Sequence, residues 1–156
     1  MQTEQERFMA CALELARQAA AAGEVPVGCV IVDKDGQVIG RGRNRREEEK
    51  NPLAHAELDA IADACRRYGD WRLKGARLYV TLEPCPMCAG GIISARIPEI
   101  YYGAKDAGFG ACGSILNLFE EDFRHHPKIV GHILEAECAA LLRDFFAQVR
   151  EKEMQT

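Results

Sequence analysis

The sequence has no apolar run approaching the roughly 20 residues that a helix needs to cross a bilayer. Its first residues, Met1 to Glu6, are acidic and lack the basic segment with which a secretory signal peptide begins. Linkers, internal repeats and low-complexity stretches are also absent. We therefore expect no membrane segment, a single domain over residues 1–156 and a cytoplasmic location.

The chain also lacks the excess of positive charge that most nucleic-acid-binding proteins carry. Its net charge is −4 at pH 7, from 20 Lys and Arg against 24 Asp and Glu. Basic residues nevertheless gather in three clusters: Arg41, Arg43, Arg45 and Arg46; Arg66, Arg67, Arg72, Lys74 and Arg77; and Arg124, His125, His126 and Lys128. Each cluster is either solvated surface or part of an RNA-binding face, and the sequence leaves both interpretations open.

The seven cysteines follow no disulfide framework, which is typical of a reducing compartment. Cys85 and Cys88 lie in a Pro-Cys-Pro-Met-Cys segment, about thirty residues after His55. One imidazole and two thiolates make three good zinc ligands. A structural zinc site usually has four protein ligands, whereas a catalytic site keeps its fourth position for water. The spacing therefore predicts one catalytic Zn²⁺ per chain, held by His55, Cys85 and Cys88.

Three alternative roles for the Cys85–Cys88 pair carry less weight. A thioredoxin-like redox pair has no need of a His-x-Glu motif. A structural zinc site would need a fourth ligand at short spacing, and a disulfide is unfavoured in a chain without an export signal. Glu57, two residues after His55, is placed to move protons to and from a metal-activated water. We therefore predict Glu57 as the catalytic residue.

Hydrophobic periodicity predicts helices alternating with strands. We expect helices over 6–22, 54–68, 86–95 and 135–151, and strands over 25–32, 38–43, 77–82, 100–103 and 129–133. Asp35-Gly36 predicts a hairpin between the first two strands. Gly40 and Gly42 indicate strand geometry or a bulge, not a phosphate-binding loop. The alternation predicts an α/β fold, a three-layer α/β/α sandwich with a mixed central sheet of about five strands.

The motif residues fit the ends of these elements. Residues two apart do not face the same side of a helix, so His55 and Glu57 can reach one metal only near a helix start. Cys85 and Cys88, three apart, lie on one side of the first turn of their own helix. Both helices follow strands, so we expect the site at one end of the sheet, with two helix N-termini favouring thiolate.

These motifs resemble the cytidine and deoxycytidylate deaminase superfamily, and the wider text is similar to the bacterial tRNA-specific adenosine deaminases. The likeness covers almost the whole chain and is strongest in 23–28, 53–57, 78–90, 103–106 and 137–142. It implies a cytidine-deaminase-like fold and conversion of adenosine to inosine at the wobble position of an arginine tRNA anticodon. It also implies a homodimer, with zinc on the three predicted ligands and Glu57 as proton shuttle.

The same resemblance assigns substrate contacts. Asn44 matches the family's strand-end asparagine at the substrate pocket, and Asp106 matches its loop aspartate near the anticodon sugars. Phe145 and Phe146 match an aromatic pair on the C-terminal helix.

Two stretches depart from the family's pattern. Ala-Gly-Phe at 107–109 stands where the family usually has a basic residue, and 119–132 differs from its usual Asn-His-containing segment. Phe109 either stacks on an anticodon base, a common device in RNA binding, or fills a hydrophobic gap in the loop.

Two further functions remain open. A deaminase of a free nucleobase or nucleoside, such as guanine or cytosine, would share the fold, the zinc and Glu57 without an RNA-facing surface. A non-catalytic zinc-binding interaction module is more remote, because it would have no use for a carboxylate beside an open metal position.

Overall fold

A computed structural model describes residues 1–155 of the chain. Its centre is one five-stranded sheet in the order β2-β1-β3-β4-β5. The strands are β1 (Gly28–Val32), β2 (Val38–Arg43), β3 (Arg77–Leu82), β4 (Glu99–Ala104) and β5 (Lys128–Val130). β1 is antiparallel to both β2 and β3, whereas β3, β4 and β5 are parallel. The sheet is therefore mixed and five-stranded, as predicted.

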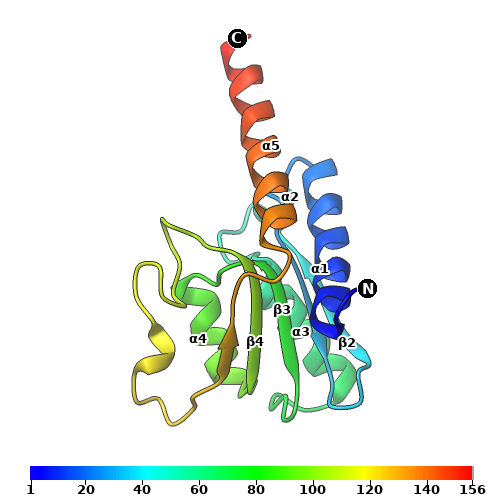
Figure 1. Cartoon of the computed structure of the whole chain (residues 1–156), viewed down its shortest axis with the longest axis vertical. Helices are drawn as coiled ribbons and strands as arrows, with labels where there is room; N and C mark the ends of the chain where they lie inside the picture. Colours follow the sequence, from blue (N-terminus) through cyan, green and yellow to red (C-terminus); the bar gives the residue numbers. More distant parts are fainter. Residues whose placement is uncertain (156) are drawn as a thin grey trace.

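Helices cover both faces of this sheet (Figure 1). They are α1 (Glu4–Ala21), α2 (Arg46–Glu49), α3 (Ala56–Tyr68), α4 (Pro86–Ala95) and α5 (Glu135–Met154). Buried residues of α1 and α5 share one apolar core with β1, β3 and β4. α3 and α4 form the second core on the opposite face. The predicted three-layer α/β/α sandwich is confirmed.

The two glycines of β2 let α3 lie unusually close to the sheet. A Cβ on Gly42 would stand 2.2 Å from the Ala56 carbonyl oxygen, and one on Gly40 would stand 2.4 Å from that of Ala60. Only a residue without a side chain fits under the helix at such distances. The glycines therefore set the position of α3, whose first turn carries the predicted catalytic carboxylate.

Three elements of the structure differ most from those predicted. β1 begins at Gly28 and not at 25, because Pro26 has no N–H and the N–H of Val27 bonds to the Val25 carbonyl instead of to a neighbouring strand. The prediction missed α2, which is only four residues long and is stabilised from a distance: the Glu24 carboxylate accepts hydrogen bonds from the N–H groups of Glu47 and Glu48. It also placed the last strand over 129–133, whereas β5 ends at Val130. His132 has a φ of 68°, which no strand residue adopts.

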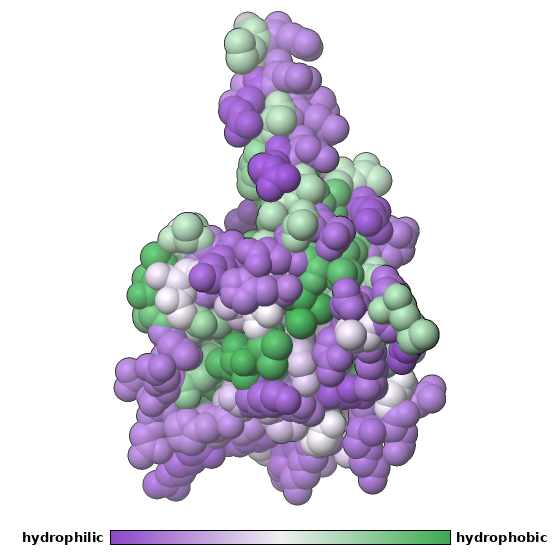
Figure 2. All heavy atoms as spheres, viewed as in Figure 1, coloured by the Kyte–Doolittle hydropathy of each residue, from purple (hydrophilic) through white to green (hydrophobic). Residues whose placement is uncertain are grey.

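α5 projects well beyond the rest of the protein and ends near the C-terminus (Figure 1). On the face drawn in Figure 2, the projecting part is mainly hydrophilic. Of its residues, only Cys138 is buried. None of the helices in residues 1–155 is both long and apolar enough to cross a membrane. The prediction of one domain over 1–156 includes Thr156, which lies outside the described residues, and it stays a prediction.

Candidate active site

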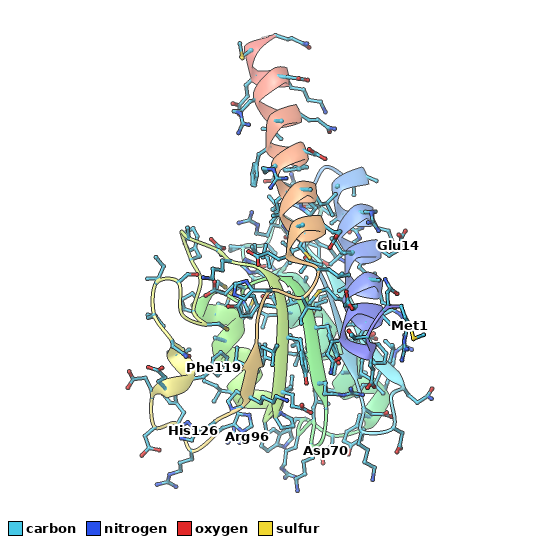
Figure 3. All side chains as sticks on the ribbon, viewed as in Figure 1. Met1, Glu14, Asp70, Arg96, Phe119 and His126 are labelled. Atoms are coloured by element: carbon cyan, nitrogen blue, oxygen red, sulfur yellow. The ribbon has the colours of Figure 1, made fainter. Side chains whose placement is uncertain are left out.

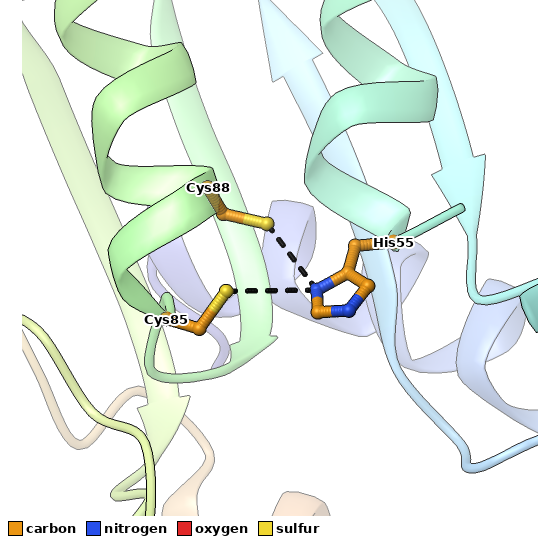
Figure 4. A group of neighbouring side chains, drawn as sticks. All are labelled: His55, Cys85 and Cys88. Carbon is orange, nitrogen blue, oxygen red and sulfur yellow. Dashed lines mark hydrogen bonds between the residues drawn. The ribbon is translucent and has the colours of Figure 1, made fainter. Parts of the chain in front are cut away.

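The three predicted zinc ligands meet at one point. The Nδ1 atom of His55 lies 3.6 Å from the Cys85 sulfur and 3.4 Å from the Cys88 sulfur (Figure 4). The ligand atoms of all three residues lie within 4.8 Å of one another. Within residues 1–155, no fourth His, Cys or carboxylate joins this group. The arrangement is that of three ligands with one position left over.

These distances fit a zinc ion. Zinc bonds of about 2.3 Å to sulfur and about 2.0–2.1 Å to nitrogen, at a tetrahedral angle, place the two ligand atoms about 3.6 Å apart. The observed separations of 3.4 and 3.6 Å agree with that value. A redox pair would not need both sulfurs turned toward an imidazole, so the geometry favours a metal site.

Local structure explains how the ligands converge. His55 is the N-cap residue of α3 and Cys85 that of α4, and neither side chain makes a capping hydrogen bond. Pro86 occupies the first turn of α4, where its missing N–H costs nothing. Cys88 follows in the same turn and is fully buried. Both helix starts therefore leave their side chains free for a metal, as predicted.

The thiols are electrostatically prepared for metal binding. A hydrogen bond from the Cys88 thiol lowers the pKa of Cys85 to about 4, and His55 contributes to the same shift. The contact with Cys85 and burial together raise the pKa of Cys88. The contact with the Cys85 sulfur also raises the pKa of His55. The Cys85 thiolate is therefore stabilised by hydrogen bonds from Cys88 and His55. A bound metal cation would take the place of the protons in these bonds.

Glu57 lies beside the ligands without joining them. It stands in the first turn of α3 and is only 4% exposed, yet it lines the same cavity as His55 and Cys85. Burial raises the pKa of Glu57 to about 7. A carboxylate with a pKa near neutrality can both accept and return a proton at cellular pH. The position and pKa fit the predicted role of proton shuttle.

Two of the ligands, His55 and Cys85, line a cavity of about 670 Å³, within the usual range for small-molecule sites. Its lining is mainly apolar, with two cations, Arg46 and Lys105. Apart from His55, Cys85 and Glu57, the lining residues are Val25, Val27, Asn44, Arg46, Leu82, Glu83, Pro86, Met87, Lys105, Asp106, Ala107, Phe109, Leu142 and Phe146. Of the predicted substrate contacts, Asn44, Asp106 and Phe146 are therefore brought together here.

Phe145 is the predicted contact that does not belong to this lining. It packs edge to face against Phe146, with ring centroids 5.5 Å apart and planes at 77°. Phe145 therefore supports Phe146, and Phe146 faces the cavity. The family resemblance could not show which of the two rings lines the cavity. Adjacent residues differ only in the side of α5 from which they project, and the sequence does not reveal that.

Asn44 lies between the end of β2 and the start of α2. Its side-chain nitrogen donates to the Val25 carbonyl, and its oxygen accepts from the N–H of Arg46, both at 3.2 Å. A carboxamide has two donor and two acceptor positions. Asn44 therefore joins the segment before β1 to the start of α2, and these two bonds leave one donor and one acceptor position of its carboxamide unused.

Another part of the cavity lining depends on Glu83, a buried carboxylate that the sequence-based prediction missed. Glu83 is 2% exposed and accepts hydrogen bonds from the N–H groups of Asp106, Cys112 and Ser114 and from the Ser114 hydroxyl. These bonds lower the pKa of Glu83. Its place directly after an apolar strand was the one available signal. Glu83 therefore holds the loop from 106 to 114 against the sheet.

We expect Glu83→Gln to lower the free energy of unfolding by about 1–3 kcal/mol, because the amide nitrogen would face donors and leave them unsatisfied. Urea unfolding followed by the fluorescence of Trp71 measures the change. The lowered pKa of Glu83 means that its contribution is present above its ordinary value of 4.5 and is lost as pH falls through the folded value. The variant and the parent should therefore converge in acid.

The matched control is Glu121→Gln, which changes an exposed carboxylate beyond this loop. It should leave the free energy of unfolding within about 0.5 kcal/mol of the parent. An equal loss in both variants, or a loss for Glu83→Gln that persists in acid, would contradict the role given to the Glu83 carboxylate.

Only one of the three basic clusters adjoins the cavity. Arg46, from the first, lines it. Lys128, from the third cluster, pairs with Glu99, the first residue of β4. The loop that lines the cavity follows Ala104, the last residue of β4, at the other end of the strand. The second cluster surrounds the start of β3. Because β3 is parallel to β4, this cluster lies at the same end of the sheet as Glu99. Figure 3 shows His126, Arg96 and Asp70 at the end of the molecule opposite α5. The second and third clusters therefore lie away from the site.

The fold and the three-ligand site define a zinc-dependent deaminase domain. The model of the cytidine and deoxycytidylate deaminase zinc-binding region matches residues 2–104. The chain is 44% identical over 152 residues to the tRNA-specific adenosine deaminase of Bacillus subtilis (strain 168), covering 97% of this chain and 94% of that protein. It is 47% identical over 148 residues to the protein of the same name from Agrobacterium fabrum (strain C58 / ATCC 33970), covering 94% and 97%. The chain belongs to the tRNA-specific adenosine deaminases of the cytidine and deoxycytidylate deaminase superfamily.

Solved structures agree with this assignment. The fold matches a structure from a study of A-to-I editing by tRNA:A34 deaminases at the wobble position of transfer RNA. That match has a TM-score of 0.83 and 47% identity, over 87% of this chain and 99% of the other. A guanine deaminase from Nitrosomonas europaea matches with a TM-score of 0.81 and 25% identity, over 91% and 84%. The fold is thus shared by deaminases of different substrates, and sequence identity separates them.

Proposed function

We propose that this protein catalyses the hydrolytic deamination of adenosine to inosine at the wobble position of a tRNA anticodon, with release of ammonia. The observation that carries this proposal is the likeness to tRNA-specific adenosine deaminases at 44–47% identity over 94–97% of the chain. The site supports it, since a three-ligand metal group and a buried carboxylate open onto one cavity.

In this proposal His55, Cys85 and Cys88 hold one Zn²⁺ per chain. Zinc, when bound, lowers the pKa of water from about 15.7 toward 7. The protein holds the ligands through the starts of α3 and α4, and it lines the adjoining cavity mainly with apolar side chains.

Glu57 moves the protons. It accepts one from the attacking water and donates it to N1 of adenine, beside the amine-bearing carbon, while the water oxygen bonds to that carbon. Glu57 then takes the second proton, from the added hydroxyl, and gives it to the amine. The C–N bond breaks, ammonia leaves and inosine remains. The burial that raises the pKa of Glu57 to about 7 suits both directions of transfer.

The substrate must present its base outside a helical stack. An enzyme that acts on a base extrudes it, and an already single-stranded nucleotide costs least to extrude. We propose an anticodon arm, of an arginine tRNA, as the RNA partner. The family resemblance also supports a homodimer working in the cytoplasm.

We expect turnover of an anticodon stem-loop with adenosine at the wobble position, and little turnover of free adenine, guanine or cytidine. Inosine and ammonia release, measured for each substrate under the same conditions, tests this. A higher kcat/KM for guanine than for the stem-loop would instead establish the second candidate, a free-base deaminase, which the match to a guanine deaminase fold favours.

Binding of the stem-loop should weaken as salt rises, with a logarithmic slope of only about −2 to −3, because few cations adjoin the cavity. Arg46→Ala should reduce that slope by about 1. Arg124→Ala, from the distant third cluster, is the control and should leave the slope unchanged. The same reduction in both variants would mean that RNA does not approach through the cavity.

A further inference from the structure

Phe109 combines exposure with a place in the active-site cavity. Its side chain is 71% exposed, more than any other large hydrophobic residue in 1–155 except the methionines near the two ends. It nevertheless lines the cavity that contains Glu57. A side chain that filled a gap in the loop would be buried, so the structure rules out that interpretation of Phe109. An aromatic ring held in water at a cavity mouth indicates a ligand surface.

The backbone beneath Phe109 is fixed. The N–H of Phe109 donates to the Asp106 carboxylate at 3.1 Å, and the N–H of Gly108 donates to the same oxygen at 3.0 Å. The N–H of Asp106 in turn donates to the buried Glu83 carboxylate at 3.1 Å. A Cβ on Gly110 would stand 2.4 Å from the Glu83 carboxylate, so the loop closes tightly around it. The backbone of Phe109 is therefore held through Asp106 by the buried Glu83 carboxylate.

Depth within the cavity separates Phe109 from the reacting base. Glu57 is 4% exposed and Cys88 is fully buried, so chemistry takes place at the closed end. Phe109 stands at the open end. Of the other lining residues, Phe146 on α5 is also exposed, at 42%, and Lys105 and Arg46 supply positive charge. Proteins commonly bind unpaired nucleotides with aromatic rings that stack on the bases and with cations that contact the phosphates.

We propose that Phe109 is an aromatic platform that stacks on a nucleobase adjacent to the reacting nucleotide. This inference rests on the proposed function, because it requires a substrate with more than one base. Stacking on a base needs only an aromatic ring with an accessible face, which Phe109 supplies. Because every base has a π-face, such a contact tolerates different bases. Glu83 and Asp106 are positioning residues for this platform, since they fix its backbone without touching the base.

The test compares Phe109→Ala, Phe109→Leu and Phe109→Trp on the anticodon stem-loop. Loss of one stacking contact should raise KM about 5- to 150-fold in the alanine variant, with kcat nearly unchanged. Leucine keeps apolar bulk without a π-face and should also raise KM, whereas tryptophan should keep KM at or below that of the parent. Phe123→Ala removes another exposed ring, 50% exposed and outside the cavity lining, and should leave KM unchanged.

A second arm locates the stacked base. Stem-loops carrying an abasic residue immediately 5′ or 3′ of the target adenosine are assayed with the parent and with Phe109→Ala. At one of these two positions, the abasic substrate should remove the difference between the two proteins, because the contact is then missing in both. A loss that persists on both abasic substrates would mean that Phe109 supports the loop and does not stack on a neighbouring base.

The outcomes separate the inference from the proposed function. If the parent deaminates the stem-loop and Phe109→Ala does so with unchanged KM, the platform is wrong and the proposed function stands. A fall in kcat without a change in KM would also overturn the platform. If the parent deaminates only free bases, both proposals fall.

Discussion

Replacing Glu57 with alanine is expected to reduce kcat by at least about 10²–10⁴-fold, the usual contribution of general acid–base catalysis. Glu57 would act in more than one proton transfer, so the upper part of this range is expected. The zinc content should stay at one per chain, because the Glu57 carboxylate is not one of the three grouped ligands. Loss of turnover without loss of metal is thus the expected signature.

Glu57→Gln separates the loss of the carboxylate from the loss of side-chain volume, because glutamine has almost the same size as the buried glutamate. The amide accepts no proton from water, so kcat should fall about as far as in Glu57→Ala. Glu14→Gln, which changes an exposed carboxylate on α1, is the control and should keep kcat within about twofold. Metal analysis accompanies each kinetic measurement. Turnover of Glu57→Gln within a few-fold of the parent would assign the proton transfers to another group.

The metal group could be predicted because its constraints are local. The spacing of Cys85 and Cys88 places both thiols in one helical turn, and the two-residue spacing of His55 and Glu57 requires a helix start. The structure begins α3 at Ala56 and α4 at Pro86, which leaves His55 and Cys85 as N-cap residues. The chemistry of zinc then requires the two halves to meet. Few folds satisfy these conditions together.

The cavity walls could not be predicted, because the bonds that shape them join distant parts of the chain. Glu83 holds a loop 23 to 31 residues further on. Glu24 holds the N–H groups of α2 from 23 and 24 residues away. A buried carboxylate looks like a surface residue in a sequence until its donors are known. The same reason applies to Phe109, whose exposure depends on the loop that Glu83 fixes.

The fold was predictable to the extent that helices and strands had strong periodicity. All five strands form, and the Asp35-Gly36 turn joins β1 and β2. Gly36 has a φ of 85°, which glycine adopts without strain. The ends of the short elements could not be predicted, because tertiary contacts set their length. β5, for example, ends where Gly131 packs against the Tyr102 ring, so closely that a Cβ on Gly131 would stand 2.5 Å from a ring carbon.

Cys88→Ser is expected to lower the zinc content well below one per chain. The thiolate is the form of cysteine that binds zinc, and a serine hydroxyl near neutral pH does not replace it. His55 and Cys85 would remain as two ligands, and within residues 1–155 no other His, Cys or carboxylate is grouped with them. Elemental analysis after dialysis against a chelator measures the zinc content.

Turnover of Cys88→Ser should fall by at least about 10³-fold, because water without zinc has a pKa of about 15.7 and not about 7. Cys138→Ser is the matched control: this thiol is also buried, at 1% exposed, but it lies in the core on the other face of the sheet. That variant should keep one zinc and its turnover, even where the free energy of unfolding falls. Because Cys88→Ser can also destabilise the protein, the comparison is made on folded material, verified by circular dichroism. One tightly held zinc in folded Cys88→Ser would show that the metal is bound elsewhere, and the three-ligand assignment would then be wrong.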